Sequence, residues 1–83
     1  MPLYMDVHHF AGGVQADDVA KAHVADLRTQ GKYDVRYLRY WVDETQGAVF
    51  CLVEAPSGDA AATVHREAHG LVARDIYQVQ EGS

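Results

Sequence analysis

The chain has 83 residues, of which 48% are hydrophobic, a composition typical of one globular domain, residues 1–83, and not of a disordered tail. Its formal net charge of −5 disfavours nucleic-acid phosphates as partners and is compatible with cation binding. No apolar run approaches the length that spans a membrane, and the first residues lack the pattern of a signal peptide, so we expect a cytoplasmic protein with no membrane partner.

The first third of the chain predicts a strand followed by a helix. Residues 3–10 are rich in β-formers, and their alternation places His8 and His9 on opposite faces of a strand. A glycine-rich break follows. Acidic residues in a first turn and an apolar stripe then predict a helix over residues 16–30, with Gly31 as its C-cap.

The middle of the chain predicts a β-hairpin. Residues 35–42 and 49–55 are β-branched and aromatic runs, and the polar segment 43–47 between them contains a glycine. We therefore expect two antiparallel strands joined by this loop.

The last third completes the order of elements. Residues 56–59 open a second helix that reaches His69, Gly70 ends it, and residues 74–80 form a final strand. The order predicts an α+β, ferredoxin-like βαββαβ fold: a four-stranded antiparallel sheet, with room for a short extra strand, and two helices on one face.

The other face of this sheet needs a cover, because it is too aromatic for solvent. A symmetric partner sheet is the expected cover, so we predict a homodimer. The small size and the single cysteine, which allows no intrachain disulfide, favour self-association as well. The residues predicted to share this face are Tyr37, Arg39, Trp41, Phe50, Leu52 and Glu54.

Two histidines at the end of the second predicted helix are the main candidates for ligands. His65 and His69 are spaced i and i+4, so both rings lie on one helix face and can share a nickel, zinc or copper ion. The alternative is that both are ordinary side chains at the margin of the core. The spacing does not match the zincin motif.

The remaining histidines are supplementary candidates. His8 and His9 point to opposite faces of a strand, so only one of them can join a site. His23 lies at the core margin of the first helix. The alternative for each is a hydrogen-bonded or exposed imidazole with no ligand. Three carboxylates of the first helix can reach an ion near His23: Asp17, Asp18 and Asp26.

Two further patterns favour no function. Cys51 lies in the middle of a predicted strand, where a cysteine usually behaves as a small buried hydrophobe. The βαββαβ order is also that of RNA-recognition domains. However, the strand at 49–55 carries no Lys or Arg, so RNA binding is disfavoured.

Nearly the whole chain resembles a family of small bacterial ferredoxin-like proteins, largely catalogued as a domain of unknown function, that has nickel-binding members. The resemblance implies a homodimer that holds nickel near its surface and serves in nickel sequestration or tolerance, with no catalysed reaction. The segments that carry it are Lys32-Tyr33, residues 35–43 (VRYLRYWVD), residues 49–56 (VFCLVEAP) and residues 65–70 (HREAHG).

These observations predict a dimeric metal-binding protein, with nickel as the first candidate and zinc or copper as competitors. His65 and His69 would supply neutral imidazole nitrogens, and His8, His9 or a group of a partner subunit would supplement them. Surface carboxylates and water would complete a six-coordinate shell. Because the rings must be unprotonated, affinity should fall as the pH drops through about 6.5.

A different class of function stays open. A small dimeric α+β barrel enzyme, of the cofactor-free monooxygenase or isomerase type, would place a pocket between sheet and helices, with His65 or His23 as general base. Such an enzyme needs a deep apolar cavity beside one buried histidine, whereas a metal site needs several histidines and carboxylates that converge. A plain interaction module is a third possibility. The side chains expected to line the pocket are Tyr37, Tyr40, Trp41 and Cys51.

Overall fold

The computed structural model describes residues 1–82 and contains every predicted helix and strand. The chain continues past the first helix as a short 3-10 helix, and the left-handed residue that turns it is Asp34 (φ 58°), so the prediction of Gly31 as a C-cap is wrong. The elements are β1 (Leu3–His9), α1 (Ala16–Thr29), η1 (Gln30–Tyr33), β2 (Arg36–Asp43), β3 (Ala48–Glu54), α2 (Gly58–Ala68) and β4 (Asp75–Val79).

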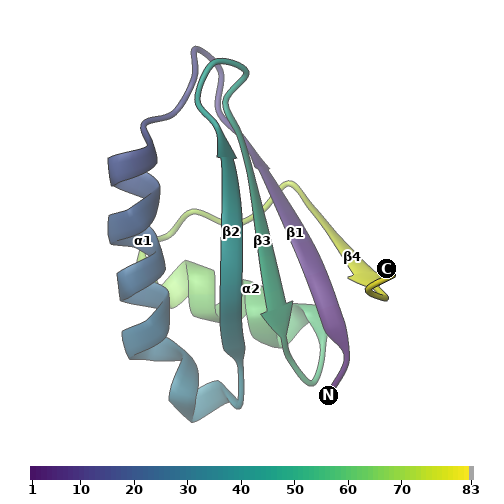
Figure 1. Cartoon of the computed structure of the whole chain (residues 1–83). Coiled ribbons are helices and arrows are strands. Elements are labelled where there is room, and N and C mark those ends of the chain that lie inside the picture. Colours follow the sequence, from purple (N-terminus) through teal and green to yellow (C-terminus); the bar gives the residue numbers. More distant parts are fainter. Residues whose placement is uncertain (83) are drawn as a thin grey trace.

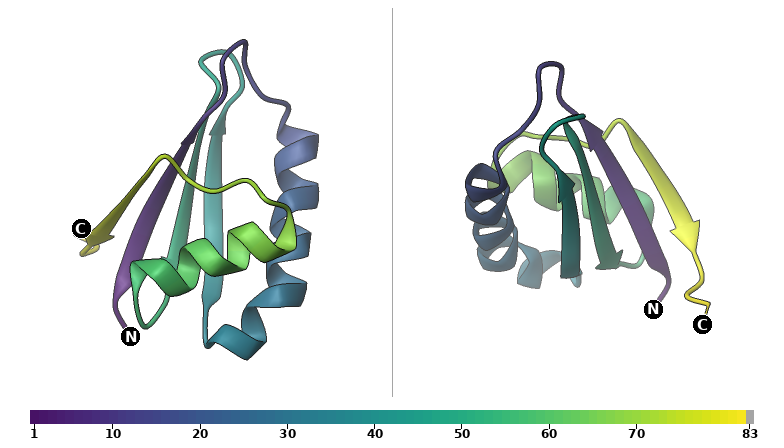
Figure 2. Two further views of the ribbon diagram at one scale, coloured as in Figure 1. Left: turned by 180° about the vertical axis from the view of Figure 1, so that it is seen from behind. Right: turned by 45° about the horizontal axis from the view of Figure 1, so that its top comes forward.

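The four strands form one sheet in the order β2-β3-β1-β4, and each neighbouring pair is antiparallel. Both helices cover the same face: α2 crosses the strands and α1 lies beside it (Figures 1 and 2). This arrangement confirms the ferredoxin-like fold. Residues 1–82 form no additional strand. Because β1 and β3 are the central strands, side chains on their helix-facing side are enclosed by both layers.

A β-bulge in β2 changes which side chains face the helices. The pairing of β2 with β3 shifts between Tyr37 and Arg39, so Tyr37 lies opposite Val53 while Arg39 lies opposite Leu52. An extra residue in one strand turns the side chains before it to the other face. The prediction that Tyr37 shares the outer face with Arg39 and Trp41 is therefore wrong, because Tyr37 is only 4% exposed and points toward the helices.

The core lies between the sheet and the helices. Its fully buried members include Val35, Val53 and Val64, and each such side chain stabilises the fold by about 1.5–3 kcal/mol. Four polar residues are also buried in this layer: Asp6, His8, Asp26 and His65. Charged and imidazole groups are rarely fully buried without partners, so this layer is the candidate location of a functional site.

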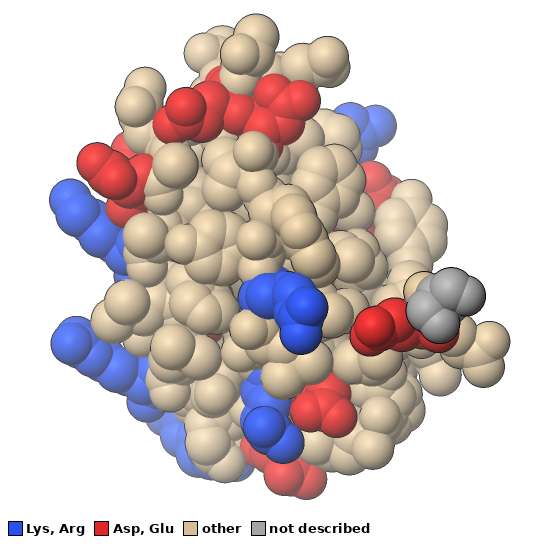
Figure 3. Space-filling model, in the orientation of Figure 1, with Lys and Arg blue, Asp and Glu red and all other residues tan. Residues whose placement is uncertain are grey.

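The outer face of the sheet has no cover within the described chain. Trp41, Phe50 and Tyr77 are 48%, 36% and 55% exposed, and Arg36 and Glu54 form an ion pair at 3.5 Å beside them. Figure 3 views this side, where uncharged residues cover most of the surface, basic atoms lie near its middle and other charged groups lie around its margins. Among residues 1–82, no helix has the length and apolar character needed to cross a membrane.

Candidate metal centre

Histidines and carboxylates from three elements meet between the sheet and the helices. β1 contributes Asp6 and His8, which alternation places on the same helix-facing side. α1 contributes Asp26, and α2, which begins after the N-cap Ser57, contributes His65. Asp6, His8, Asp26 and His65 are each at most 5% exposed.

On the inner side of the cluster, several polar side chains contact the carboxylate of Asp6. His65 Nε2 lies 3.0 Å from Asp6 Oδ2, and His8 Nε2 lies 3.1 Å from Asp6 Oδ1. The hydroxyl of Tyr37 donates to Asp6 Oδ2 at 2.8 Å, which is the consequence of the bulge in β2. Cys51, opposite Asp6 on β3, completes a group in which one ligand atom of each of Asp6, His8, Cys51 and His65 lies within 4.8 Å of the others.

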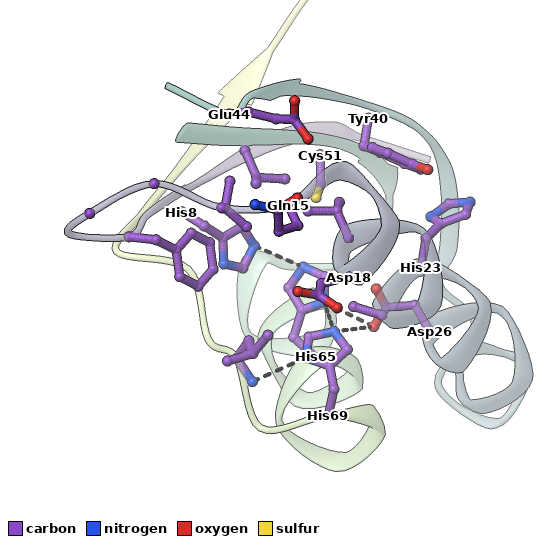
Figure 4. Close-up of a pocket in the computed structure, with 18 of the residues that line it drawn as sticks. His8, Gln15, Asp18, His23, Asp26, Tyr40, Glu44, Cys51, His65 and His69 are labelled. Carbon is purple, nitrogen blue, oxygen red and sulfur yellow. Dashed lines mark hydrogen bonds and ion pairs between the residues drawn. The ribbon is translucent and has the colours of Figure 1, made fainter. Parts of the chain in front are cut away.

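On the outer side, two imidazole rings contact the carboxylate of Asp26. Asp26 Oδ1 lies 2.9 Å from His65 Nδ1 and 3.0 Å from His69 Nε2, and these two nitrogens lie 3.1 Å apart. The second nitrogen of His69, Nδ1, accepts from the backbone N–H of Leu71 at 3.0 Å. His65 therefore stands between two carboxylates, with one ring nitrogen toward each. Figure 4 shows the outer of these carboxylates, Asp26, beside His65 and His69.

This position controls the charge of His65. Burial disfavours the imidazolium, but hydrogen bonds to Asp26 and Asp6 outweigh burial and raise the pKa of His65 to about 9. Burial alone would raise the pKa of Asp6, but its hydrogen bonds with His65 and His8 lower that pKa by more. Without an ion, the chain therefore holds a protonated His65 between two carboxylates at neutral pH.

Three further members of the cluster, Cys51, Tyr37 and His69, are neutral. Burial raises the pKa of the Cys51 thiol and of the Tyr37 hydroxyl, and the charge of Asp6 raises both further. Burial lowers the pKa of His69. Each buried side-chain nitrogen and oxygen in residues 1–82 has a hydrogen-bond partner, so protons satisfy the cluster in the metal-free chain.

A cavity of about 530 Å³ opens beside the cluster, and His8, Cys51, His65 and His69 line it. This volume lies within the range of about 300–1,000 Å³ that is usual for small-molecule sites. No Lys or Arg of the described chain lines the cavity. Its apolar walls include Phe10, Val14, Val19, Val49 and Leu71.

The donor atoms are spaced as ligands of a transition-metal ion would be. Around an ion with bonds of about 2.0–2.1 Å, neighbouring nitrogen and oxygen ligands are about 2.9–3.4 Å apart. The outer group of Asp26, His65 and His69 has separations of 2.9, 3.0 and 3.1 Å. In the inner group, His65 Nε2 lies 3.0 Å from Asp6 Oδ2 and 3.3 Å from His8 Nε2, while His8 Nε2 lies 3.1 Å from the other oxygen of Asp6, Oδ1. Both groups share His65.

The structure brings together three of the five histidines predicted as ligands: His8, His65 and His69. His9 is exposed on the opposite face of β1. His23 lies on the cavity wall against Tyr40, with ring centroids 4.9 Å apart.

Part of the cluster was not predicted from the sequence. Asp6 shares the alternation that singled out His8, so strand periodicity was a usable signal for it. Cys51 was expected to be an inert buried residue, and Asp26 was considered only as a neighbour of His23. Tyr37 was assigned to the wrong face, and no local signal in the sequence marks the bulge that turns it inward.

Comparison with known proteins agrees with this architecture. The family model described as nickel responsive protein SCO4226-like matches residues 4–79. A solved structure, titled as the crystal structure analysis of SCO4226 from Streptomyces coelicolor A3(2), is similar with a TM-score of 0.89 and 34% identity, covering 98% of this chain and 99% of that one. No curated protein matches the chain. Because the family model spans most of the sequence and the fold agrees, the chain belongs to the SCO4226-like family of nickel responsive proteins.

Proposed function

We propose that this protein binds a divalent transition-metal ion, nickel first, in the cluster centred on His65, and that it serves in nickel sequestration or tolerance in the cytoplasm without catalysing a reaction. The observation that carries the proposal is the convergence of imidazole and carboxylate donors at separations of 2.9–3.3 Å. The name of the family supports nickel as the first ion. Zinc and copper accept the same ligand types and remain competitors.

The proposal places His65 at the centre as the residue that the two groups share, with His69 on its outer side and His8 on its inner side. His65 is the residue without which neither group retains its geometry. His9 and His23 lie outside both groups, so the proposal gives them no part in this site.

Isothermal titration of metal-stripped, tag-free protein with Ni²⁺ at pH 7.5 tests the proposal. We expect micromolar binding that the double variant His65→Ala/His69→Ala loses. His9→Ala is the matched control, since it removes an exposed imidazole from the other face of the sheet and should leave binding unchanged. No binding by the parent protein would refute the proposal, and so would equal losses in the control and in the double variant.

We also propose that the outer sheet face joins two copies of the chain. The exposed aromatic side chains Trp41, Phe50 and Tyr77 support this interface, because exposed apolar patches of this kind commonly mark sites of association. Light scattering after gel filtration should give a dimer for the parent and a monomer for Trp41→Glu. Leu27→Glu, which places the same charge on exposed α1, should stay dimeric. A monomeric parent would refute the interface.

The cavity favours a second candidate function, a small-molecule enzyme of the cofactor-free monooxygenase or isomerase type. Its apolar walls and its volume of about 530 Å³ suit a small organic substrate. Both ring nitrogens of His65 lie against carboxylates, so His23, on the cavity wall, would be the base. Ligand-observed NMR of metal-free protein with a fragment mixture tests this candidate. Binding that Ala22→Phe abolishes, by filling the cavity, supports it, whereas no binding counts against it.

A further inference from the structure

Asp6 is the point at which the inner group converges. Its carboxylate accepts from the Tyr37 hydroxyl at 2.8 Å, and the Nε2 atoms of His8 and His65 lie 3.1 and 3.0 Å from its two oxygens. The Sγ atom of Cys51 lies within 4.8 Å of ligand atoms of Asp6, His8 and His65. Asp6 is 1% exposed, so three buried donors and a buried thiol surround one buried acceptor. A cation bound beside the Asp6 carboxylate would take the place of the protons that the neighbouring side chains now donate to it.

The tautomers of the outer group indicate that His69 and Asp26 position His65 and do not themselves bind the ion. A backbone N–H can only donate, so the bond from Leu71 requires His69 Nδ1 to be an acceptor. A neutral His69 then carries its proton on Nε2, which faces Asp26 at 3.0 Å and has no free lone pair for an ion. His69 therefore holds Asp26 in place, and Asp26 in turn accepts from His65 Nδ1 at 2.9 Å. This arrangement leaves Nε2 as the nitrogen of His65 that can ligate.

We propose that Asp6, His8, Cys51 and His65 form a sulfur-containing site for one borderline or soft ion, and that this inner group is where the proposed metal binding takes place. The inference rests on the proposed function and adds its ligand set and ligand class. A thiolate with two imidazoles and a carboxylate favours nickel, zinc or copper over Mg²⁺, Ca²⁺ and Mn²⁺.

The surroundings of the four ligands match those of protein metal sites. Ligating imidazoles usually donate their second nitrogen to a carboxylate, as His65 does to Asp26, and ligating carboxylates accept hydrogen bonds, as Asp6 does from Tyr37. Within the group, His65 Nε2 lies 3.0 Å from Asp6 Oδ2 and 3.3 Å from His8 Nε2, and both separations approach the tetrahedral value of about 3.3 Å. The charges of the carboxylate and the thiolate balance a divalent ion.

Metal binding at this site balances in protons. The ion forms a bond to Sγ of Cys51, whose proton leaves to solvent, and a bond to Nε2 of His65, whose Nε2 proton also leaves. His65 keeps its proton on Nδ1, toward Asp26. His8, whose Nε2 proton faces Asp6 in the metal-free chain, loses that proton to solvent and takes one from solvent on Nδ1, so Nε2 is free to ligate and the net release stays at two protons. Three of the ligands, His8, Cys51 and His65, line the cavity, which gives the ion its path from solvent.

Titration of reduced, metal-stripped protein with Co²⁺ tests the sulfur ligand by absorption. We expect a near-ultraviolet thiolate-to-cobalt charge-transfer band that saturates at one ion per chain. Cys51→Ser should abolish the band and weaken binding about tenfold or more, while keeping a small polar side chain at the position. His69→Ala should keep the band, because His69 is a positioning residue. A band that persists in Cys51→Ser would overturn the inference, as would binding that only His69→Ala abolishes.

Zinc-edge X-ray absorption of the parent protein gives a second readout that needs no variant. One sulfur neighbour at about 2.3 Å is expected beside nitrogen and oxygen at about 2.0–2.1 Å. A bound ion with a shell of nitrogen and oxygen alone would overturn the sulfur site and leave the proposed metal binding intact. Failure of Ni²⁺, Zn²⁺ and Co²⁺ to bind at all would overturn both, so the two failures are distinguishable.

Discussion

Raising the pH from 6.5 to 8.5 should strengthen nickel binding far more than ordinary imidazole ligands would allow. Hydrogen bonds to Asp26 and Asp6 outweigh burial and raise the pKa of His65 to about 9, so the ring must lose a proton before it can ligate. The deprotonated fraction then rises from about 0.3% at pH 6.5 to about 24% at pH 8.5, which strengthens apparent affinity about 75-fold. An imidazole with the usual pKa of about 6.5 would contribute only about twofold over this interval.

The competition between protons and the metal ion for His65 can also be expressed as a free energy of binding. At pH 7.5 the protonated ring weakens apparent affinity about 30-fold relative to a fully deprotonated one, or about 2 kcal/mol, given a pKa of about 9 for His65. Formation of a thiolate at Cys51 would make the dependence steeper still. The pH at which binding weakens is therefore higher than the value near 6.5 that the sequence suggests.

Calorimetric titrations with Ni²⁺ at pH 6.5, 7.5 and 8.5, in buffers that do not coordinate nickel, measure this dependence. Repeating the titration at pH 7.5 in two buffers of different ionisation enthalpy counts the released protons, of which His65 should supply about one. Asp26→Asn is the matched variant. It removes one of the two carboxylates that raise the pKa of His65, so its pH dependence should be shallower. An apparent affinity for Ni²⁺ that changes by less than about fivefold between pH 6.5 and 8.5, with no proton release on binding, would refute the reasoning.

Three further changes test the cluster and its scaffold. In the metal-free protein the raised pKa of His65 contributes up to about 3 kcal/mol, fully present below about pH 6.5 and lost as the pH rises through about 9, so urea midpoints should fall on going from pH 6.5 to 9.5. A flat profile would show that His65 is not charged in the folded state. Tyr37→Phe removes a hydroxyl that donates to a buried carboxylate at 2.8 Å and should cost about 1.5–3 kcal/mol in urea denaturation, whereas a loss below about 0.5 kcal/mol would contradict this hydrogen bond. Gly47→Ala should destabilise the chain by about 2 kcal/mol or more, because Gly47 has a φ of 71° and an added Cβ would collide with the carbonyl oxygen of Phe10. An unchanged melting temperature would disprove this contact.

Much of the fold could be predicted because it depends on local periodicity. Alternation in residues 3–10 correctly separated His8 from His9, and the helical spacing of the second helix placed His65 and His69 on one face. The end of the first helix was harder, since Gly31 suits a cap but the chain continues as a 3-10 helix to Asp34. The competing hydrogen bonds at a helix end differ little in energy, so a glycine alone does not decide the boundary.

The amino-acid sequence by itself determined the order of elements, the pairing of the hairpin and the presence of imidazoles on a helix and a strand that both face the core. Tertiary structure decided which carboxylates and which sulfur join them. Asp26 meets His65 only because α1 packs beside α2, and Cys51 meets Asp6 only because β1 pairs with β3 in this register. The bulge in β2 that turns Tyr37 inward likewise depends on pairing. Contacts between elements far apart in sequence depend on packing and register, which no single stretch of the chain encodes.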